Sequence, residues 1–178
     1  MHTSLILTVI ADDKPGIVEK IAEPITAAGP NWEESRMSRL AGKFAGLLRI
    51  SVDAAGADAL AAHLAALRSQ GFTIAVERSA DMSPAALRTR HLDLIGNDRP
   101  GIIRDLSRVL ARHGVNIDAL ETAVASAPMS GEVLFRANAN LRAPSTLSLE
   151  SLRTELEALA GELMVDLTLD DVAEAGTA

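Results

Sequence analysis

The chain has 178 residues, of which 48% are hydrophobic and 23% charged, a composition typical of folded globular proteins. The net charge of −7, without any run of Lys or Arg, disfavours direct binding to nucleic acid. Aromatic residues amount to 2% and cysteine is absent, which argues against a base-stacking surface and excludes disulfides and thiolate metal sites. No stretch approaches the roughly 18 uncharged apolar residues of a membrane span, so we expect a cytoplasmic protein without membrane contact.

The first half of the chain predicts alternating strands and helices in the order β-α-β-β-α-β. The expected strands are 5–10, 32–40, 44–52 and 72–78, and the expected helices are 15–28 and 57–70. Asp13 lies near the N-terminus of the first helix, and Pro15 is expected in its first turn. Apolar residues at helical spacing, Ile17, Ile21 and Ile25, predict the face of this helix that is buried.

An internal repeat relates the two halves of the chain. A shift of 85 residues aligns the segment that begins at Leu7 with the segment that begins at Leu92, and the same shift pairs Gly46 with Gly131. The identical pairs are Leu7/Leu92, Ile10/Ile95, Asp13/Asp98, Pro15/Pro100, Gly16/Gly101, Ile17/Ile102, Gly29/Gly114 and Asn31/Asn116. The second copy predicts strands at 91–95, 115–124, 131–141 and 163–169 and helices at 100–113 and 148–160. A repeat of this extent indicates two copies of one domain.

The repeated element order predicts an α+β protein with two ferredoxin-like domains in tandem. Each domain is expected to form a four-stranded antiparallel sheet with two helices on one face. The expected domains are residues 1–80 and 90–172. Residues 81–89, which include Pro84, are expected to be a linker, and residues 173–178 a flexible tail.

The two strand-to-helix corners, ADDKPGIV and GNDRPGII, carry the groups best suited to a ligand. Unpaired backbone N–H groups at a helix start suit a carboxylate, and glycine lets the backbone approach it closely. An aspartate at the same corner accepts from an ammonium group, and an asparagine amide both donates and accepts. We expect each asparagine to return to the corner of its own domain. The candidate ligand-binding residues are Asp13, Lys14, Gly16, Ile17, Asn31, Asp98, Arg99, Gly101, Ile102 and Asn116. These groups suit a free amino acid; alternatively, the same residues only cap helices and form turns.

The corner D-[KR]-P-G-I-[VI], followed by G-x-N about 13 residues later, resembles the ACT domains that bind amino acids. Over nearly its whole length the chain resembles tandem ACT-domain proteins, and most closely the glycine cleavage system transcriptional repressor family, whose N-[WI]-E-[ED]-S-R stretch is similar to NWEESR at 31–36. The resemblance implies a non-enzymatic protein that senses a small amino acid, expected to be glycine. It also implies control of glycine cleavage genes through contact with a transcription factor. The second copy lacks the Glu-Ser-Arg run, so the two sites need not be equivalent.

Three alternatives to this function follow from the same fold. The first is a stand-alone ACT sensor that controls a metabolic enzyme in trans. An enzyme such as an acylphosphatase would need an arginine-bearing phosphate loop, which neither corner resembles. RNA binding of the RRM type would need aromatic residues on the open face of the sheet, and Phe44 and Phe135 cannot be both platform and core. We expect no catalytic residue, metal or cofactor; the expected partners are an amino acid and a protein, and a homodimer is left open.

Overall fold

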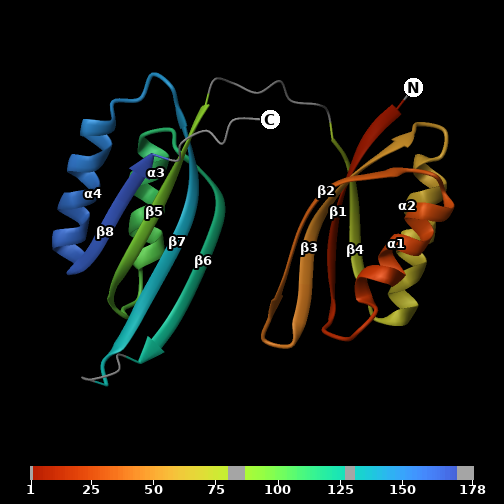
Figure 1. Cartoon of the computed structure of the whole chain (residues 1–178), viewed down its shortest axis with the longest axis horizontal. Helices are drawn as coiled ribbons and strands as arrows, with labels where there is room; N and C mark the ends of the chain where they lie inside the picture. The colour runs from red at the N-terminus through yellow and green to blue at the C-terminus, as the bar shows by residue number, and fades with distance from the viewer. Residues whose placement is uncertain (1, 80–86, 127–130, 172–178) are drawn as a thin grey trace. The chain divides into compact units, whose positions relative to one another are not determined.

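The computed structural model describes residues 2–79, 87–126 and 131–171, and the chain divides into two compact units, Met1–Ser83 and Pro84–Ala178. Each unit contains the element order β-α-β-β-α-β (Figure 1). In each unit both helices cover one face of a four-stranded antiparallel sheet (Figure 1). The α+β class and the ferredoxin-like arrangement predicted from the repeat are therefore confirmed.

The first unit has the strand order β2-β3-β1-β4, with the antiparallel partners β3 and β4 on either side of β1. Its elements are β1 (His2–Asp12), α1 (Ile17–Ala27), β2 (Asn31–Leu40), β3 (Lys43–Asp53), α2 (Ala57–Ala66), the short 3-10 helix η1 (Leu67–Gln70) and β4 (Thr73–Ser79). The edge strands of this sheet, among the described residues, are β2 and β4.

The second unit repeats this arrangement, with the strand order β6-β7-β5-β8. Its elements are β5 (Leu87–Asn97), α3 (Ile102–Arg112), β6 (Asn116–Ser126), β7 (Val133–Pro144), α4 (Leu149–Leu163) and β8 (Val165–Asp171). Both copies also interrupt the pairing of the edge strand at the same place, between Trp32 and Glu34 in β2 and between Ile117 and Ala119 in β6.

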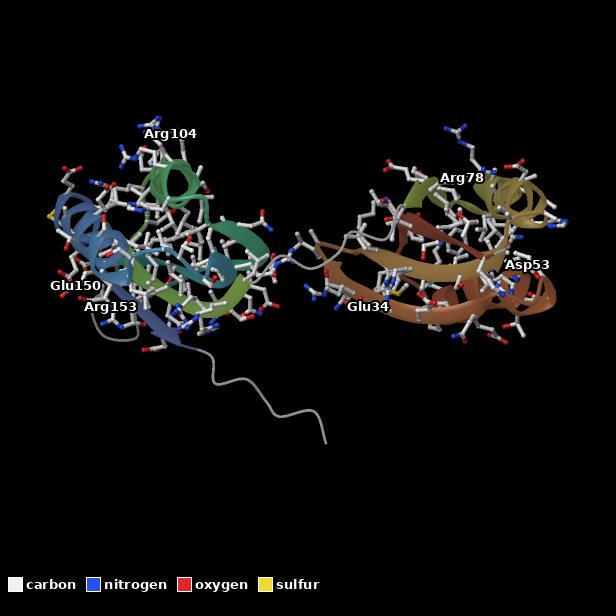
Figure 2. The ribbon with its side chains drawn as sticks, turned by 90° about the horizontal axis from the view of Figure 1, so that it is seen from above. Glu34, Asp53, Arg78, Arg104, Glu150 and Arg153 are labelled. Atoms are coloured by element: carbon white, nitrogen blue, oxygen red, sulfur yellow. The ribbon has the colours of Figure 1, made fainter. Side chains whose placement is uncertain are left out.

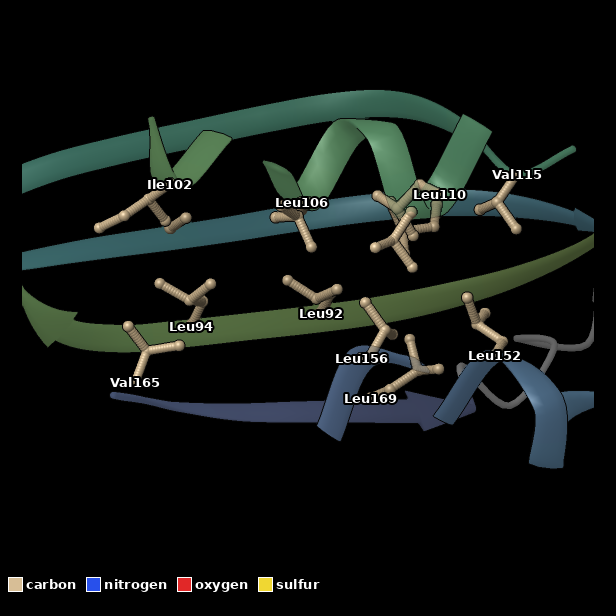
Figure 3. Close-up of a cluster of buried hydrophobic side chains, with 14 of the residues drawn as sticks. Leu92, Leu94, Ile102, Leu106, Leu110, Val115, Leu152, Leu156, Val165 and Leu169 are labelled. Carbon is tan, nitrogen blue, oxygen red and sulfur yellow. The ribbon is translucent and has the colours of Figure 1, made fainter. Parts of the chain in front are cut away.

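Each unit has its own hydrophobic core between the sheet and the helices. Alternate residues of a strand point to opposite faces, so the buried residues of β1 lie two apart, and the helical spacing of Ile17, Ile21 and Ile25 buries one face of α1. Figure 3 shows the second core, where Leu92 and Leu94 of β5 lie opposite Leu106 and Leu110 of α3. Full burial of a leucine side chain contributes about 1.5–3 kcal/mol. The loop between β1 and α1, and the equivalent loop of the second unit, are thus each attached to a core of their own unit.

All four aromatic residues of the chain belong to these cores. Phe72 is buried in the first core, Trp32 and Phe44 pack against it, and Phe135 packs against the second core. The faces of the two sheets that the helices leave uncovered therefore have no aromatic ring. A base-stacking platform of the RRM type is not available on either sheet.

The first helix of each unit begins two residues later than the sequence predicts. Gly16 and Gly101 precede the helices in the left-handed conformation, with φ of +87° and +99°, and α1 and α3 begin at the next residue. The expected place of Pro15 in the first helical turn is therefore wrong: Pro15 belongs to the loop. The reason is backbone geometry. Residues of a right-handed helix have negative φ, so the helix cannot extend toward the N-terminus past a residue with positive φ.

Two other expectations from the sequence need correction. In the first sheet Gly46 of β3 pairs with Val9, and in the second sheet Ala137 pairs with Leu94, the residue equivalent to Val9. Ala137 is therefore the structural equivalent of Gly46, at an offset of 137 − 46 = 91 residues. The expected pairing of Gly46 with Gly131, at an offset of 85, is wrong. The second hairpin is six residues longer between equivalent pairs, because Thr122 pairs with Ala137 where the first hairpin pairs Met37 with Gly46. Strand β5 begins at Leu87, so residues 87–89 belong to the second sheet and not to a linker. The remaining linker residues, 81–86, and the expected tail, 173–178, lie outside the described residues.

Candidate functional site

The loop between β1 and α1 presents a helix start whose backbone has no side-chain cap. Asp13 does not cap this helix. Its backbone N–H donates to the carbonyl of Gly42 (3.0 Å), and its carboxylate forms an ion pair with Nε of Arg39. The expected role of Asp13 as acceptor for a ligand ammonium group therefore competes with an arginine of the same domain.

The equivalent loop between β5 and α3 is held in the same way but leaves its aspartate open. The backbone N–H of Asp98 donates to the carbonyl of Val133 (2.9 Å), and Arg99 donates through Nη2 to the backbone oxygen of Glu162 (3.3 Å). Among the described residues, the Asp98 carboxylate forms no ion pair or hydrogen bond. Asp98 is therefore available to an external cation.

A charge difference separates the two corners, and it lies in the first turn of each helix. A Cβ atom built on Gly101 would lie 3.0 Å from Nη2 of Arg104, whereas a Cβ on Gly16 would lie 3.7 Å from Oε2 of Glu19. The start of α3 thus carries an Arg104–Asp105 ion pair, with Asp105 Oδ2 at 3.6 Å from the same Cβ, whereas, among the described residues, the start of α1 carries the carboxylate of Glu19 without a cation beside it at that distance. Because a helix N-terminus attracts anions, Glu19 occupies at the first corner the place that an external carboxylate would take.

Arg104 is held in this position by its neighbour. Its Nε and Nη2 donate to the two carboxylate oxygens of Asp105, at 2.9 and 3.1 Å, and Figure 2 shows the side chain at the surface of α3. This hydrogen bonding raises the pKa of the Arg104 guanidinium and, from the other side, lowers the pKa of the Asp105 carboxyl. The bidentate geometry fixes the plane of the guanidinium while leaving part of it exposed.

A recess of about 120 Å³ adjoins the first corner. Among its lining residues are Asp12 at the end of β1, Lys14 and Pro15 of the loop, Lys20 of α1 and Gly71, which follows η1. A recess of this size has room for a small ion or a few water molecules. Its two lysines suit a small anion, while Asp12 is already paired with Lys43.

The two asparagines lie far from the corners to which the sequence assigns them. Asn31 starts β2 and pairs with Ser51, which lies opposite Ser4 near the beginning of β1, while the corner follows the end of β1 at Asp12. Helix α1 separates the two places by its length of 11 residues, about 16 Å. The expectation that Asn31 returns to the corner of its own domain is therefore wrong.

Asn116 occupies the corresponding place in the second unit. It starts β6, pairs with Arg142, and donates through Nδ2 to Oδ1 of Asp118 (2.8 Å). Asp118 is in turn paired with Arg142. This small network stands at the opposite end of α3 from Gly101, so one domain does not bring Asn116 and Gly101 together.

The remaining candidates divide into exposed and buried groups. Lys14 is exposed, whereas Ile17 and Ile102 are 7% and 2% exposed and lie in the two cores. The isoleucines therefore anchor the helix starts and do not offer their side chains to a ligand. Arg104 was not among the residues expected from the sequence. The signal was present, because the 85-residue offset sets Glu19 against Arg104.

The comparison with protein families identifies the fold. A family model of the ACT domain matches residues 3–77, and a second model of the ACT domain matches residues 91–161. The chain therefore belongs to the ACT-domain family and consists of two ACT domains in tandem. The members of this family are regulatory modules.

Two solved structures are similar to this protein over nearly the whole chain. A protein of unknown function from Galdieria sulphuraria is 31% identical, with a TM-score of 0.87, over 97% of this chain and 100% of that one. A candidate glycine cleavage system transcriptional repressor is 22% identical, with a TM-score of 0.73, over 98% of this chain and 99% of that one. At 22% sequence identity, the similarity to this second structure shows a shared fold only. A search of curated proteins finds no match.

Two further properties bear on the kind of site. No helix in the described part of the chain is long and apolar enough to cross a membrane. Within the same residues, no three His, Asp or Glu side chains gather in a group that could hold a metal ion.

Proposed function

We propose that this protein is a non-enzymatic regulator that binds a small amino acid, with glycine as the favoured ligand, and acts through contact with a protein partner. The observation that carries the proposal is the second corner, where Arg104 stands beside the uncapped start of α3 and Asp98 is open. This corner offers positive groups for a carboxylate and a negative group for an ammonium ion.

The proposed binding mode assigns one role to each group. The backbone N–H groups that follow Gly101 and the guanidinium of Arg104 bind the ligand carboxylate, and Asp98 accepts from its ammonium group. Gly101 has no side chain, so a ligand can approach its backbone closely. At its φ of +99° any other residue would be strained. The first corner binds an amino acid more weakly, because Glu19 repels the carboxylate and Arg39 already holds Asp13.

Asn116 contributes to this site only from a second copy of the chain. Strand β6 is an edge of its sheet, and its last residue, Ser126, pairs with Val133, whose carbonyl also accepts from Asp98. A second β6 that runs antiparallel beside this one would bring its own first residue, Asn116, next to the Asp98 loop. On the same reasoning Asn31 of the edge strand β2 would serve the first corner.

The regulated process is proposed from resemblance. The likeness in fold to the candidate glycine cleavage repressor and the NWEESR stretch at 31–36 favour control of glycine cleavage genes through a transcription factor. The acidic net charge of −7 favours a protein partner over direct contact with DNA. Control of a metabolic enzyme in trans is the second candidate, and co-purification of the partner distinguishes the two.

Isothermal titration calorimetry of glycine, with the other amino acids as competitors, tests the ligand. Replacement of Arg104 by Gln removes a charged hydrogen bond, so we expect the affinity to fall about tenfold or more. Arg108→Gln is the matched control, because Arg108 is an exposed arginine one turn further along α3. Equal affinities of the two variants would contradict the assignment of the carboxylate to Arg104, and the absence of binding by any amino acid would contradict the proposed function.

A further inference from the structure

We propose that two copies of this chain associate through the uncovered face of the first sheet. In β1 the residues that alternate with the buried Leu5, Leu7 and Val9 point away from the helices, and these include Ile6 and Ile10. Leu47 of β3 lies beside them, because it pairs with Thr8. Ile10 and Leu47 are 44% and 53% exposed, which is unusual for large apolar side chains that lie next to one another on a rigid sheet.

The second sheet is an internal control for this observation. By strand register, the positions of Ile6, Thr8 and Leu47 are occupied there by His91, Asp93 and Asn138. These polar residues are bonded to one another: Asn138 Nδ2 donates to Asp93 Oδ1 (2.7 Å), and His91 Nε2 lies 3.1 Å from Asp93 Oδ2. Both copies retain an apolar core, and Ile95 of the second sheet matches Ile10, so the uncovered faces differ at the positions of Ile6 and Leu47, which are polar in the second copy. Core packing does not explain that difference, since this face lies outside the core.

The size of the face meets the requirement of a stable dimer. Its four strands have 7 to 11 residues each. With strands about 4.8 Å apart and a rise of about 3.4 Å per residue, the face measures about 600 Å². Two such faces would bury about 1,200 Å², the lower end of the range for specific interfaces.

The charges at the margins of the face complement one another under two-fold symmetry. Arg36 lies on the edge strand β2, level with Leu47, and Glu77 lies on the opposite edge strand β4, level with Ile6. A two-fold axis that runs parallel to the strands places β2 of one copy over β4 of the other. Arg36 of each copy then faces the region of Glu77 in the second copy, so the contact is made twice. Strand β3 of each copy then lies over β1 of the other, which covers Leu47; Arg49, level with Ile6 on the same face, is paired with Glu33 (3.2 Å).

The oligomeric state tests this surface without any ligand, and Leu47 lies in the first unit, away from the edge strand β6 and from Asp98, so its replacement is independent of the proposed amino-acid site. We expect sedimentation equilibrium of the wild type to show a dimer and Leu47→Asn to weaken it at least tenfold, as for other central interface residues. Met164→Asn, at an exposed apolar residue of the second unit, is the matched control and should leave the dimer unchanged. Arg36→Glu and Glu77→Arg should each weaken association, and the double reversal should restore it.

Crosslinking distinguishes this face from an edge-to-edge contact. The chain has no cysteine, so Thr8→Cys introduces a unique thiol on the inner strand β1 of the proposed face. A bismaleimide should link two such copies, whereas Thr168→Cys, on the uncovered face of the second sheet, should remain largely unlinked. A monomeric wild type, equal linking of the two variants, or a Leu47→Asn protein that dimerises like the wild type would each overturn the proposal.

Discussion

Replacement of Gly101 by alanine separates backbone strain from ligand chemistry. An alanine at the φ of +99° costs about 1–2 kcal/mol in conformational strain. The loss of freedom in the unfolded chain offsets about 0.4–1 kcal/mol of this cost, which leaves a destabilisation of about 1 kcal/mol. For a domain of this size, that corresponds to a decrease of about 4–8 °C in melting temperature.

The equivalent substitution Gly16→Ala is the matched control. Gly16 has nearly the same strain, with φ of +87°, but its new Cβ would meet only Glu19 Oε2 at an ordinary contact distance of 3.7 Å. At Gly101 the new Cβ would lie 3.0 Å from Nη2 of Arg104, so the guanidinium must move. We therefore expect both variants to lose similar stability, and only Gly101→Ala to lose affinity for an amino acid.

The assays are differential scanning calorimetry and titration calorimetry with glycine. Because the chain has two compact units, the shift for each variant should appear in the transition of the unit that carries it. An unchanged melting temperature for Gly101→Ala would refute the strain argument. If Gly16→Ala weakened binding as much as Gly101→Ala, the assignment of the ligand to the second corner would be wrong.

Three further expectations follow from the contacts described above. Hydrogen bonds from Lys43 and Arg104 lower the pKa values of Asp12 and Asp105, respectively, from 3.8. Both ion pairs therefore stabilise the protein above pH 3.8, and this stabilisation is lost as the pH falls through the lowered pKa values. Urea unfolding at decreasing pH should show this loss of stability, and Asp105→Asn should make the loss smaller. Leu106→Ala, at a residue 1% exposed, should cost about 2–5 kcal/mol in chemical unfolding, whereas Val124→Ala on the exposed edge should cost under about 0.5 kcal/mol. The purified protein alone should give no salt-dependent footprint on a promoter fragment, since its net charge is −7.

The repeat and its periodicities were sufficient to predict the fold. The isoleucines of α1 lie at helical spacing, and the apolar residues of β1 alternate. Such local patterns show which side of an element is buried, and a short segment of sequence is enough to recognise them. The charge reversal between Glu19 and Arg104 was also present in the aligned sequences. Its importance became visible only when the left-handed glycines placed these side chains beside the helix starts.

The site, in contrast, depended on distances that the sequence does not contain. Asn31 and Gly16 flank the same helix, and the length of that helix, about 16 Å, sends them to opposite ends of the sheet. The pairing of Asp13 with Arg39 required the register of β2 against β3, and the extra residues of the second hairpin changed the equivalence of Gly46. Residue type and local spacing thus determined the elements and their buried faces. Only the tertiary structure decided which polar groups meet, because those contacts join residues far apart in the chain.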